Sequence, residues 1–279
     1  MTGYAEHADQ ASFRSAWDAA GTSALGPTAM AMAGGALADR AAWVFVAGYQ
    51  AAVRQCFDVG AYRGWGSYLV SERREASGEP TCWLSLGGDG ASLQGSKSWL
   101  AAASDLDFLV VNATLRDEPG RTRDVVLAAD VAGVAVEPRT GGRFLPELEQ
   151  GGARFDAVAL DATNLLDGER VFGAFAFVEA RCLVLAHCGH FLVLRHDVER
   201  LELARELAEG LATAELASTE SLKLLIEAQT LLLDWFADWV AEPPARDAHW
   251  QRWHDDQRLV GMHRPIAEKR LAKALAAAS

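Results

Sequence analysis

Cysteine is scarce in this sequence, and its four cysteines are poorly placed for chemistry. Cys56, Cys82, Cys182 and Cys188 form no C-x-x-C pair, and the last two are six positions apart. Residues six apart do not share one helix face well, and metal or redox sites built on cysteine usually need closer spacing. We therefore predict free thiols packed as small hydrophobic side chains, and we expect no metal site.

Basic residues are also in the minority. The chain has 26 lysines and arginines against 38 aspartates and glutamates, which gives a formal net charge of −12. A protein that binds nucleic acid presents a basic face to the phosphates. The charge balance therefore argues against a nucleic-acid partner.

The sequence also lacks long hydrophobic runs and an N-terminal targeting pattern. We find no apolar run that approaches the roughly 20 residues of a membrane-spanning helix. The N-terminus also lacks a basic segment followed by an apolar one. We therefore expect a cytoplasmic protein with no membrane partner. Its 279 residues are half hydrophobic and 23% charged, an ordinary globular composition that is long enough for a large core.

The central part of the chain alternates short apolar stretches with glycine-rich turns such as Gly87-Gly88-Asp89-Gly90. This regular spacing predicts a compact antiparallel sheet domain or a small barrel. The expected strands are residues 65–70, 81–86, 92–100, 108–115, 124–129, 134–138 and 153–160.

Helical periodicity flanks this part on both sides. We predict a short helix over residues 6–20 and a stronger one over 36–57, where Gly48 permits close packing against a neighbour. Beyond residue 171 the pattern predicts helices over about 172–207, 208–241 and 246–277, the last kinked at Pro265. The expected organisation is therefore α+β, with a helical segment 1–64, a β-sheet domain 65–171 and a helical domain 172–279.

The stretch Gly95-Ser96-Lys97-Ser98-Trp99 carries the clearest local signal. A glycine ahead of a lysine and a large aromatic residue lets the backbone approach a flat partner that the indole contacts face-on. The alternative interpretation is an ordinary strand with a glycine bulge.

This stretch resembles the G-x-K-x-W signature of the acyl-CoA dehydrogenase family. Three further segments resemble that family in the same order, over roughly residues 65–170: Tyr68-Leu69-Val70-Ser71-Glu72, the strand pair at 124–134, and residues 155–168. The resemblance implies N-terminal helices, a central antiparallel β domain and a C-terminal helical bundle. It also implies a short, atypical member truncated at both helical ends.

FAD is the cofactor that the resemblance implies. Ser71 matches the hydroxyl residue that contacts the flavin, and Trp99 matches the tryptophan beside the isoalloxazine ring. Ala101 stands where the family usually has a threonine or serine that donates to the reactive ring nitrogen, so one group that tunes the ring is missing. After Ala186 we find neither the family's Arg-x-x-Phe-Gly segment nor its Gly-Gly loop.

The activity implied by the resemblance is α,β-dehydrogenation of an acyl thioester carried by CoA or by a carrier protein. Glu179 is the candidate catalytic base, one residue out of register with a minority of the family, and Arg181 and His187 are candidate substrate-binding residues. Other interpretations stay open at this stage. Glu179 in solvent would pair with a basic neighbour, and His187 and His190 would divide into one packed and one solvated residue.

The missing donor and the missing C-terminal segments also favour a second function. A flavin-free protein of the same fold would act as a binding or structural subunit, or as a non-redox lyase or cyclase. In either case the broad apolar stripe of the C-terminal helices, together with the family's mode of assembly, predicts a homodimer.

Overall fold

The computed structural model describes residues 6–60, 62–73, 79–88, 90–139, 145–166, 171–195, 198–215, 218–241 and 256–277. The chain folds into two compact units. Met1–Gln55 and Gly173–Ser279 form one, here called the helical unit, and Cys56–Phe172 form the other, called the β unit. The two ends of the sequence thus belong to the same unit.

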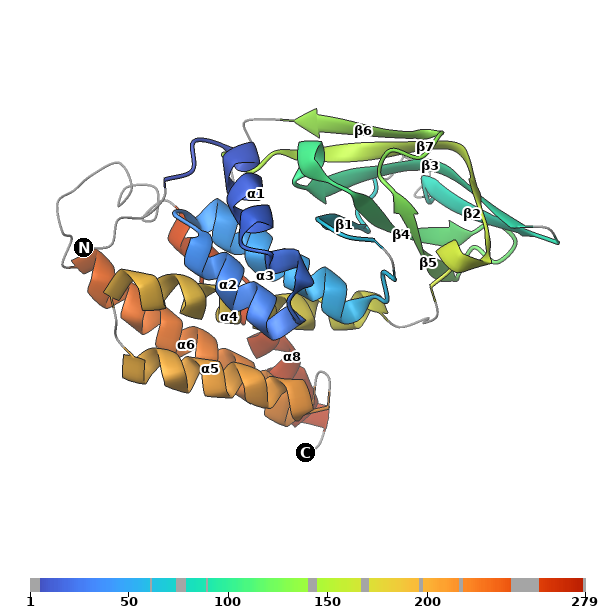
Figure 1. Cartoon of the computed structure of the whole chain (residues 1–279). Helices are drawn as coiled ribbons and strands as arrows, with labels where there is room; N and C mark the ends of the chain where they lie inside the picture. Colours follow the sequence, from blue (N-terminus) through green and yellow to red (C-terminus); the bar gives the residue numbers. More distant parts are fainter. Residues whose placement is uncertain are drawn as a thin grey trace. The chain divides into compact units, whose positions relative to one another are not determined.

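Seven α-helices are described, and in Figure 1 α5, α6 and α8 lie side by side. α1 begins with a capping box, because Asp9 and Ser12 each accept a hydrogen bond from the other's backbone N–H. The helices are α1 (Gln10–Ala19), α2 (Pro27–Leu37), α3 (Ala41–Cys56), α4 (Val171–Arg195), α5 (Val198–Thr213), α6 (Thr219–Ala241) and α8 (Arg264–Ala277), with short 3-10 turns η1 (Thr22–Ala24) and η4 (Gln257–Leu259).

Glycines bring α2 and α3 into direct contact with α4. A Cβ atom added to Gly35 would lie 2.0 Å from the carbonyl oxygen of Ala186, and one added to Gly48 would lie 2.8 Å from Leu183. From the other side, a Cβ on Gly189 of α4 would lie 2.1 Å from the carbonyl oxygen of Met32. The expected close approach at Gly48 is therefore confirmed, and it belongs to a set of three such contacts.

The central helix α4 corrects one expectation from the sequence. Its segment Ala174–Val193 is long and apolar enough to cross a membrane, although no such run was expected. Within the protein 78% of this segment is buried, as in the core helix of a globular bundle. Three of the four cysteines are buried, Cys182 and Cys188 of this helix among them, and all four are free thiols as predicted.

The β unit is a seven-stranded sheet with the order β1-β4-β2-β3-β7-β6, in which β5 also pairs with β4. It is mixed and not purely antiparallel as expected, because β1 and β2 each run parallel to β4, whereas the remaining pairs are antiparallel. The hairpin of β2 and β3 separates β1 from β4 in sequence, so the chain returns beside β1 in the same direction. The strands are β1 (Gly66–Leu69), β2 (Cys82–Gly87), β3 (Gly90–Ala101), β4 (Phe108–Leu115), β5 (Thr122–Ala128), β6 (Val134–Arg139) and β7 (Gln150–Leu160).

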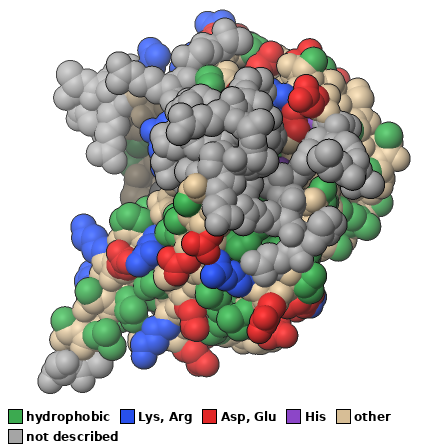
Figure 2. Space-filling model, turned by 90° about the vertical axis from the view of Figure 1, so that its left-hand side faces the viewer, with side chains coloured by type: hydrophobic (Ala, Val, Ile, Leu, Met, Phe, Trp, Pro, Cys, Tyr) green, Lys and Arg blue, Asp and Glu red, His purple; other side chains and the backbone are tan. Residues whose placement is uncertain are grey.

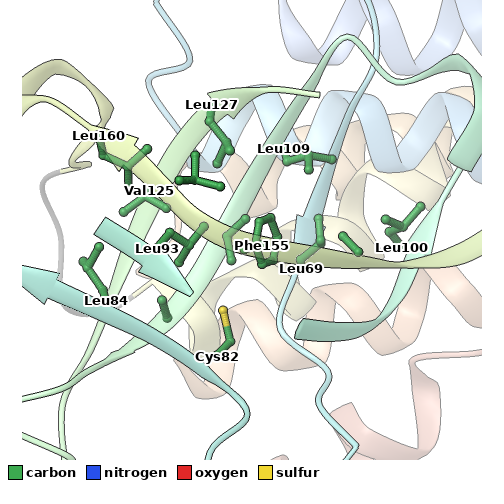
Figure 3. Close-up of a cluster of buried hydrophobic side chains, with 14 of the residues drawn as sticks. Leu69, Cys82, Leu84, Leu93, Leu100, Leu109, Val125, Leu127, Phe155 and Leu160 are labelled. Carbon is green, nitrogen blue, oxygen red and sulfur yellow. The ribbon is translucent and has the colours of Figure 1, made fainter. Parts of the chain in front are cut away.

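One hydrophobic cluster fills the inner face of this sheet (Figure 3). Phe155 of β7 lies among Leu69, Leu93 and Leu109, which come from three other strands, and each of these side chains is at most 1% exposed. Burial of large apolar side chains on this scale is the main force that holds a sheet of this size together.

On the face drawn in Figure 2, acidic and basic side chains are interspersed over the described part of the surface. That face carries no broad area of lysine and arginine among the residues described.

The expected strands match the observed ones closely, whereas the helices differ in three places. Gly34 and Gly35, expected before a helix, lie inside α2, and the helix expected over 36–57 begins at Ala41. Two helices were expected over 172–207 and 208–241, whereas the structure has three helices in this region: α4, α5 and α6. Pro265 lies in the first turn of α8, where proline is tolerated, and it does not kink the helix. The expected helix before residue 256 lies outside the described residues.

We expect Gly35→Ala to destabilise the helical unit. The new methyl group has no room against the Ala186 carbonyl, so the backbones must separate, and the free energy of unfolding should fall by about 1–3 kcal/mol or more. Urea denaturation followed by circular dichroism measures the change. Gly210→Ala is the matched control: its Cβ would have only an ordinary 3.8 Å contact, so that helix should gain up to about 1 kcal/mol. Equal effects of the two changes would contradict the close-contact account.

Candidate functional site

Lys97 ties the strand of the G-x-K-x-W stretch to the segment that carries Ser71. Its side chain is 1% exposed and forms an ion pair with Glu72, and its ammonium also donates to the Val70 carbonyl at 3.3 Å. The backbone N–H of Ser98 donates to the Ser71 carbonyl at 2.8 Å. Ser71 therefore has a fixed backbone, while its side chain is exposed and its hydroxyl has no hydrogen-bond partner among the described residues.

Trp99 is held at its polar end. Its indole N–H donates to the side-chain oxygen of Gln150 at 2.9 Å, and Gln150 is the first residue of the neighbouring strand β7. The indole is half-buried. A ring anchored by one hydrogen bond and partly open to its surroundings is suited to contact another flat group.

Ala101 has no donor to offer. The residue is buried, and its backbone N–H donates to the Ser67 hydroxyl at 3.2 Å. The next residue, Ala102, has φ 58° and begins the turn that leaves the strand. The side-chain donor that the family usually has at this position is therefore absent, and the backbone N–H is already engaged.

Glu179 lies on α4 in the helical unit and faces His263. Its Oε2 is 3.5 Å from the His263 Nε2, and the two side chains are 13% and 12% exposed. Burial raises the pKa of Glu179 from its ordinary 4.5 to about 8, and burial lowers the pKa of His263 from 6.5 to about 4. Both shifts favour the neutral forms. At neutral pH both groups are therefore uncharged: the carboxyl group is protonated, and the imidazole carries no second proton.

A small cavity of about 20 Å³ lies beside this pair. Its walls are mainly apolar and come from α4, α6 and α8, with His263 and the exposed Arg270 as the polar members. The lining residues are Ala176, Phe177, Ala180, Leu222, Leu225, His263, Ile266, Ala267 and Arg270.

Arg181 and His187, expected to bind substrate, are buried in α4. Arg181 is 3% exposed, and its Nε has no partner among the described residues. Burial raises the pKa of the adjacent Cys182 thiol to about 12, and the charge of Arg181 opposes part of that rise. His187 is 1% exposed and its Nδ1 bonds the Leu183 carbonyl at 2.7 Å. His190 is also fully buried, so the interpretation that one of the two histidines is solvated is wrong.

His263 is the residue that the sequence reasoning missed. It lies directly before α8, and its carbonyl accepts the N–H of Ala267 at 3.1 Å as the first bond of that helix. The signal available in the sequence was the segment His263-Arg264-Pro265, in which a proline marks the first turn of a helix. That signal indicates a helix boundary and does not indicate Glu179 as its neighbour.

We expect Glu72→Gln to lower the free energy of unfolding by about 3 kcal/mol, because it leaves the buried Lys97 ammonium without a counter-charge. Glutamine keeps the shape, and its one oxygen can still accept the bond from the Thr81 N–H, but its NH2 group then faces the Lys97 ammonium, so the change removes the charge and the acceptor that Lys97 uses. Chemical denaturation at pH 7 measures the loss. The control is Glu118→Gln, which breaks an ion pair with Arg121 whose side chains are 55% and 54% exposed, and it should change stability by less than about 0.5 kcal/mol. A loss at Glu72 as small as the control's would contradict a structural role for the pair.

Comparison with known proteins gives structural matches only. No protein-family model and no curated protein sequence matches the chain. The chain is similar to the solved structure of FkbI, a protein for biosynthesis of the methoxymalonyl extender unit of the polyketide immunosuppressant Fk520. That match has 19% identity and a TM-score of 0.65, and it covers 90% of this chain and 84% of that chain.

Two further matches extend over nearly the whole sequence. Butyryl-CoA dehydrogenase from Megasphaera elsdenii matches with a TM-score of 0.71 and 13% identity, over 96% of this chain and 90% of that chain. PigA, solved with FAD and proline, matches with a TM-score of 0.67 and 12% identity, over 99% of this chain and 88% of that chain. Identities this low establish architecture alone. The protein has the acyl-CoA dehydrogenase fold, an α+β arrangement of N-terminal helices, a central β domain and C-terminal helices.

Proposed function

We propose that the protein is a flavin-dependent oxidoreductase that introduces a double bond between the α and β carbons of an acyl thioester, with Glu179 as the base. The observation that carries this proposal is the Glu179 carboxyl beside His263, only 13% exposed, where burial raises its pKa to about 8. Removal of a proton next to a thioester carbonyl needs a base whose pKa lies near the working pH. The fold shared with butyryl-CoA dehydrogenase supports the same reaction class.

Burial makes Glu179 a stronger base than a solvated glutamate. When the carboxylate takes a proton it becomes neutral, and the neutral acid suits its poorly hydrated surroundings. His263, 3.5 Å away and itself neutral, adds no fixed positive charge that would hold the carboxylate in its ionised form.

The β unit supplies the residues that fit a flavin ring. Trp99 offers an anchored, half-buried indole, and Ser71 offers an exposed hydroxyl on a backbone fixed through Lys97. Ala101 departs from the fit, because its N–H is bonded to Ser67. When bound, the flavin would accept the hydride that leaves the β carbon. PigA, a match in fold, was solved with FAD.

The first test is flavin binding by the purified protein. We expect added FAD to bind, with absorbance near about 450 nm, and we expect Trp99→Ala to weaken binding roughly tenfold because the stacked ring is lost. Quenching of flavin fluorescence during titration measures the affinity. Trp83→Ala is the matched control, since Trp83 lies on β2 under the Arg116 guanidinium, and it should leave the affinity unchanged. A colourless protein that also fails to bind added FAD would favour the flavin-free alternative, a binding or structural subunit.

The second test is the pH dependence that Glu179 imposes. The base acts as carboxylate, so turnover of an acyl-CoA should rise as pH increases through about 8 and should be lost in Glu179→Gln. A rate profile flat from pH 6 to about 9 would exclude this base.

Stability provides a second measurement that needs no substrate. Between pH 4.5 and about 8 the folded protein keeps a proton on Glu179 that the unfolded chain releases, so the carboxyl's contribution to stability is lost as pH rises through that window. The wild-type free energy of unfolding should therefore fall relative to Glu179→Gln over this range. Glu220→Gln, at an exposed position on α6, should follow the wild type throughout.

A further inference from the structure

A second cavity lies within the β unit, apart from the residues assigned to the flavin. Its volume is about 330 Å³, within the range of small-molecule sites, and none of Ser71, Trp99 and Ala101 lines it. The lining residues are Cys56, Phe57, Asp58, Gly60, Asp124, Ala162, Thr163, Leu165 and Leu166.

Asp124 lines this cavity with a buried carboxylate that is only half satisfied. The residue is 3% exposed. Its Oδ1 accepts hydrogen bonds from the Tyr68 hydroxyl at 3.1 Å and from the Asn112 side-chain amide at 2.9 Å. Its Oδ2 has no donor in the part of the chain that the structure describes. Oδ2 is not among the fully enclosed side-chain oxygens that lack a partner in the described residues, so it is accessible and free to accept a hydrogen bond from a ligand in the cavity.

In the part of the chain that the structure describes, no cation is bonded to Oδ2. Lys97 has a favourable long-range effect on Asp124, but its ammonium is bonded to Glu72 and to the Val70 carbonyl. The described lining residues include no lysine, arginine or histidine. Burial accordingly raises the pKa of Asp124 above its ordinary value, against the effect of its two hydrogen bonds.

The other polar groups of the cavity also present acceptors. Thr163 donates its hydroxyl proton to Asp161 at 2.6 Å, which leaves its oxygen as an acceptor, and Asp58 adds a second carboxylate that is exposed. Apolar surface comes from Leu165 and from Phe57, whose ring packs against Tyr68 with centroids 4.6 Å apart. The cavity thus combines a negative polar end with apolar walls.

We propose that this cavity binds a small organic cation, a primary ammonium group on a short alkyl body. The ammonium donates to Asp124 Oδ2 and to the Thr163 oxygen, and the alkyl body packs against Phe57 and Leu165. Charge-assisted hydrogen bonds to a buried carboxylate are stronger than neutral ones, so the charged end carries the specificity. The site is independent of the oxidoreductase function proposed above.

The probe is n-butylammonium chloride, titrated into the whole protein at constant ionic strength and pH 7.5. We expect a saturable rise in the melting temperature and matching shifts of the backbone amide signals of Asp124, Thr163 and Leu166 in NMR spectra. The neutral n-butanol should produce neither effect. Asp124→Asn should weaken the ammonium affinity at least roughly tenfold, because it removes the charge and keeps the shape. Asp130→Asn, an exposed acid outside the cavity, is the matched control and should bind like the wild type.

A second variant tests the same proposal if Asp124→Asn does not fold. Leu165→Trp fills the cavity from its apolar wall without changing any charge, and it should abolish the ammonium response. No saturable response in the wild type, an equal response to n-butanol, or an unchanged affinity in either cavity variant would overturn the proposal.

Discussion

Direct backbone contact between three helices is the constraint on which the helical unit depends. Gly35 and Gly48 meet α4 without side chains between them, and Gly189 meets α2 in the same way. Close-packed interiors transmit small displacements, so these contacts leave α4 little freedom to shift against α2 and α3. Because Glu179 projects from α4, the orientation of the candidate base follows from glycines that never touch it.

In the β unit, a buried ion pair and not a glycine contact holds two segments together. Lys97 is almost wholly buried, and its ion pair joins β3 to the segment of Ser71, beside the backbone bond from the Ser98 N–H to the Ser71 carbonyl. A lysine in the middle of an amphipathic strand suggests a solvated side chain. Here the ammonium has an internal use, because it aligns the serine and tryptophan that are the candidate ring contacts. The charge therefore contributes to the geometry of the site more than to net stability.

The positions of the strands could be predicted from the sequence, but the pairing of the strands within the sheet could not. Turns such as Gly87-Gly88-Asp89-Gly90 mark strand ends locally, which explains the close agreement of the strand boundaries. Parallel pairing of β1 with β4 depends on where the chain returns, and no local pattern encodes it. A glycine pair in the sequence can likewise indicate either a helix end or a close contact between helices. Gly34 and Gly35 resemble a break, but they lie inside α2 because the helix must approach its neighbours closely.

The start of α8 has a consequence for the unfolded chain. Pro265 fixes one backbone angle and restricts Arg264 before it, so the segment that follows His263 samples few conformations even before folding. Ordering that turn therefore removes little conformational entropy. The restriction reaches as far as Arg264, directly after the histidine that faces the Glu179 carboxyl, so part of the entropy cost of ordering this turn is already absent in the unfolded chain.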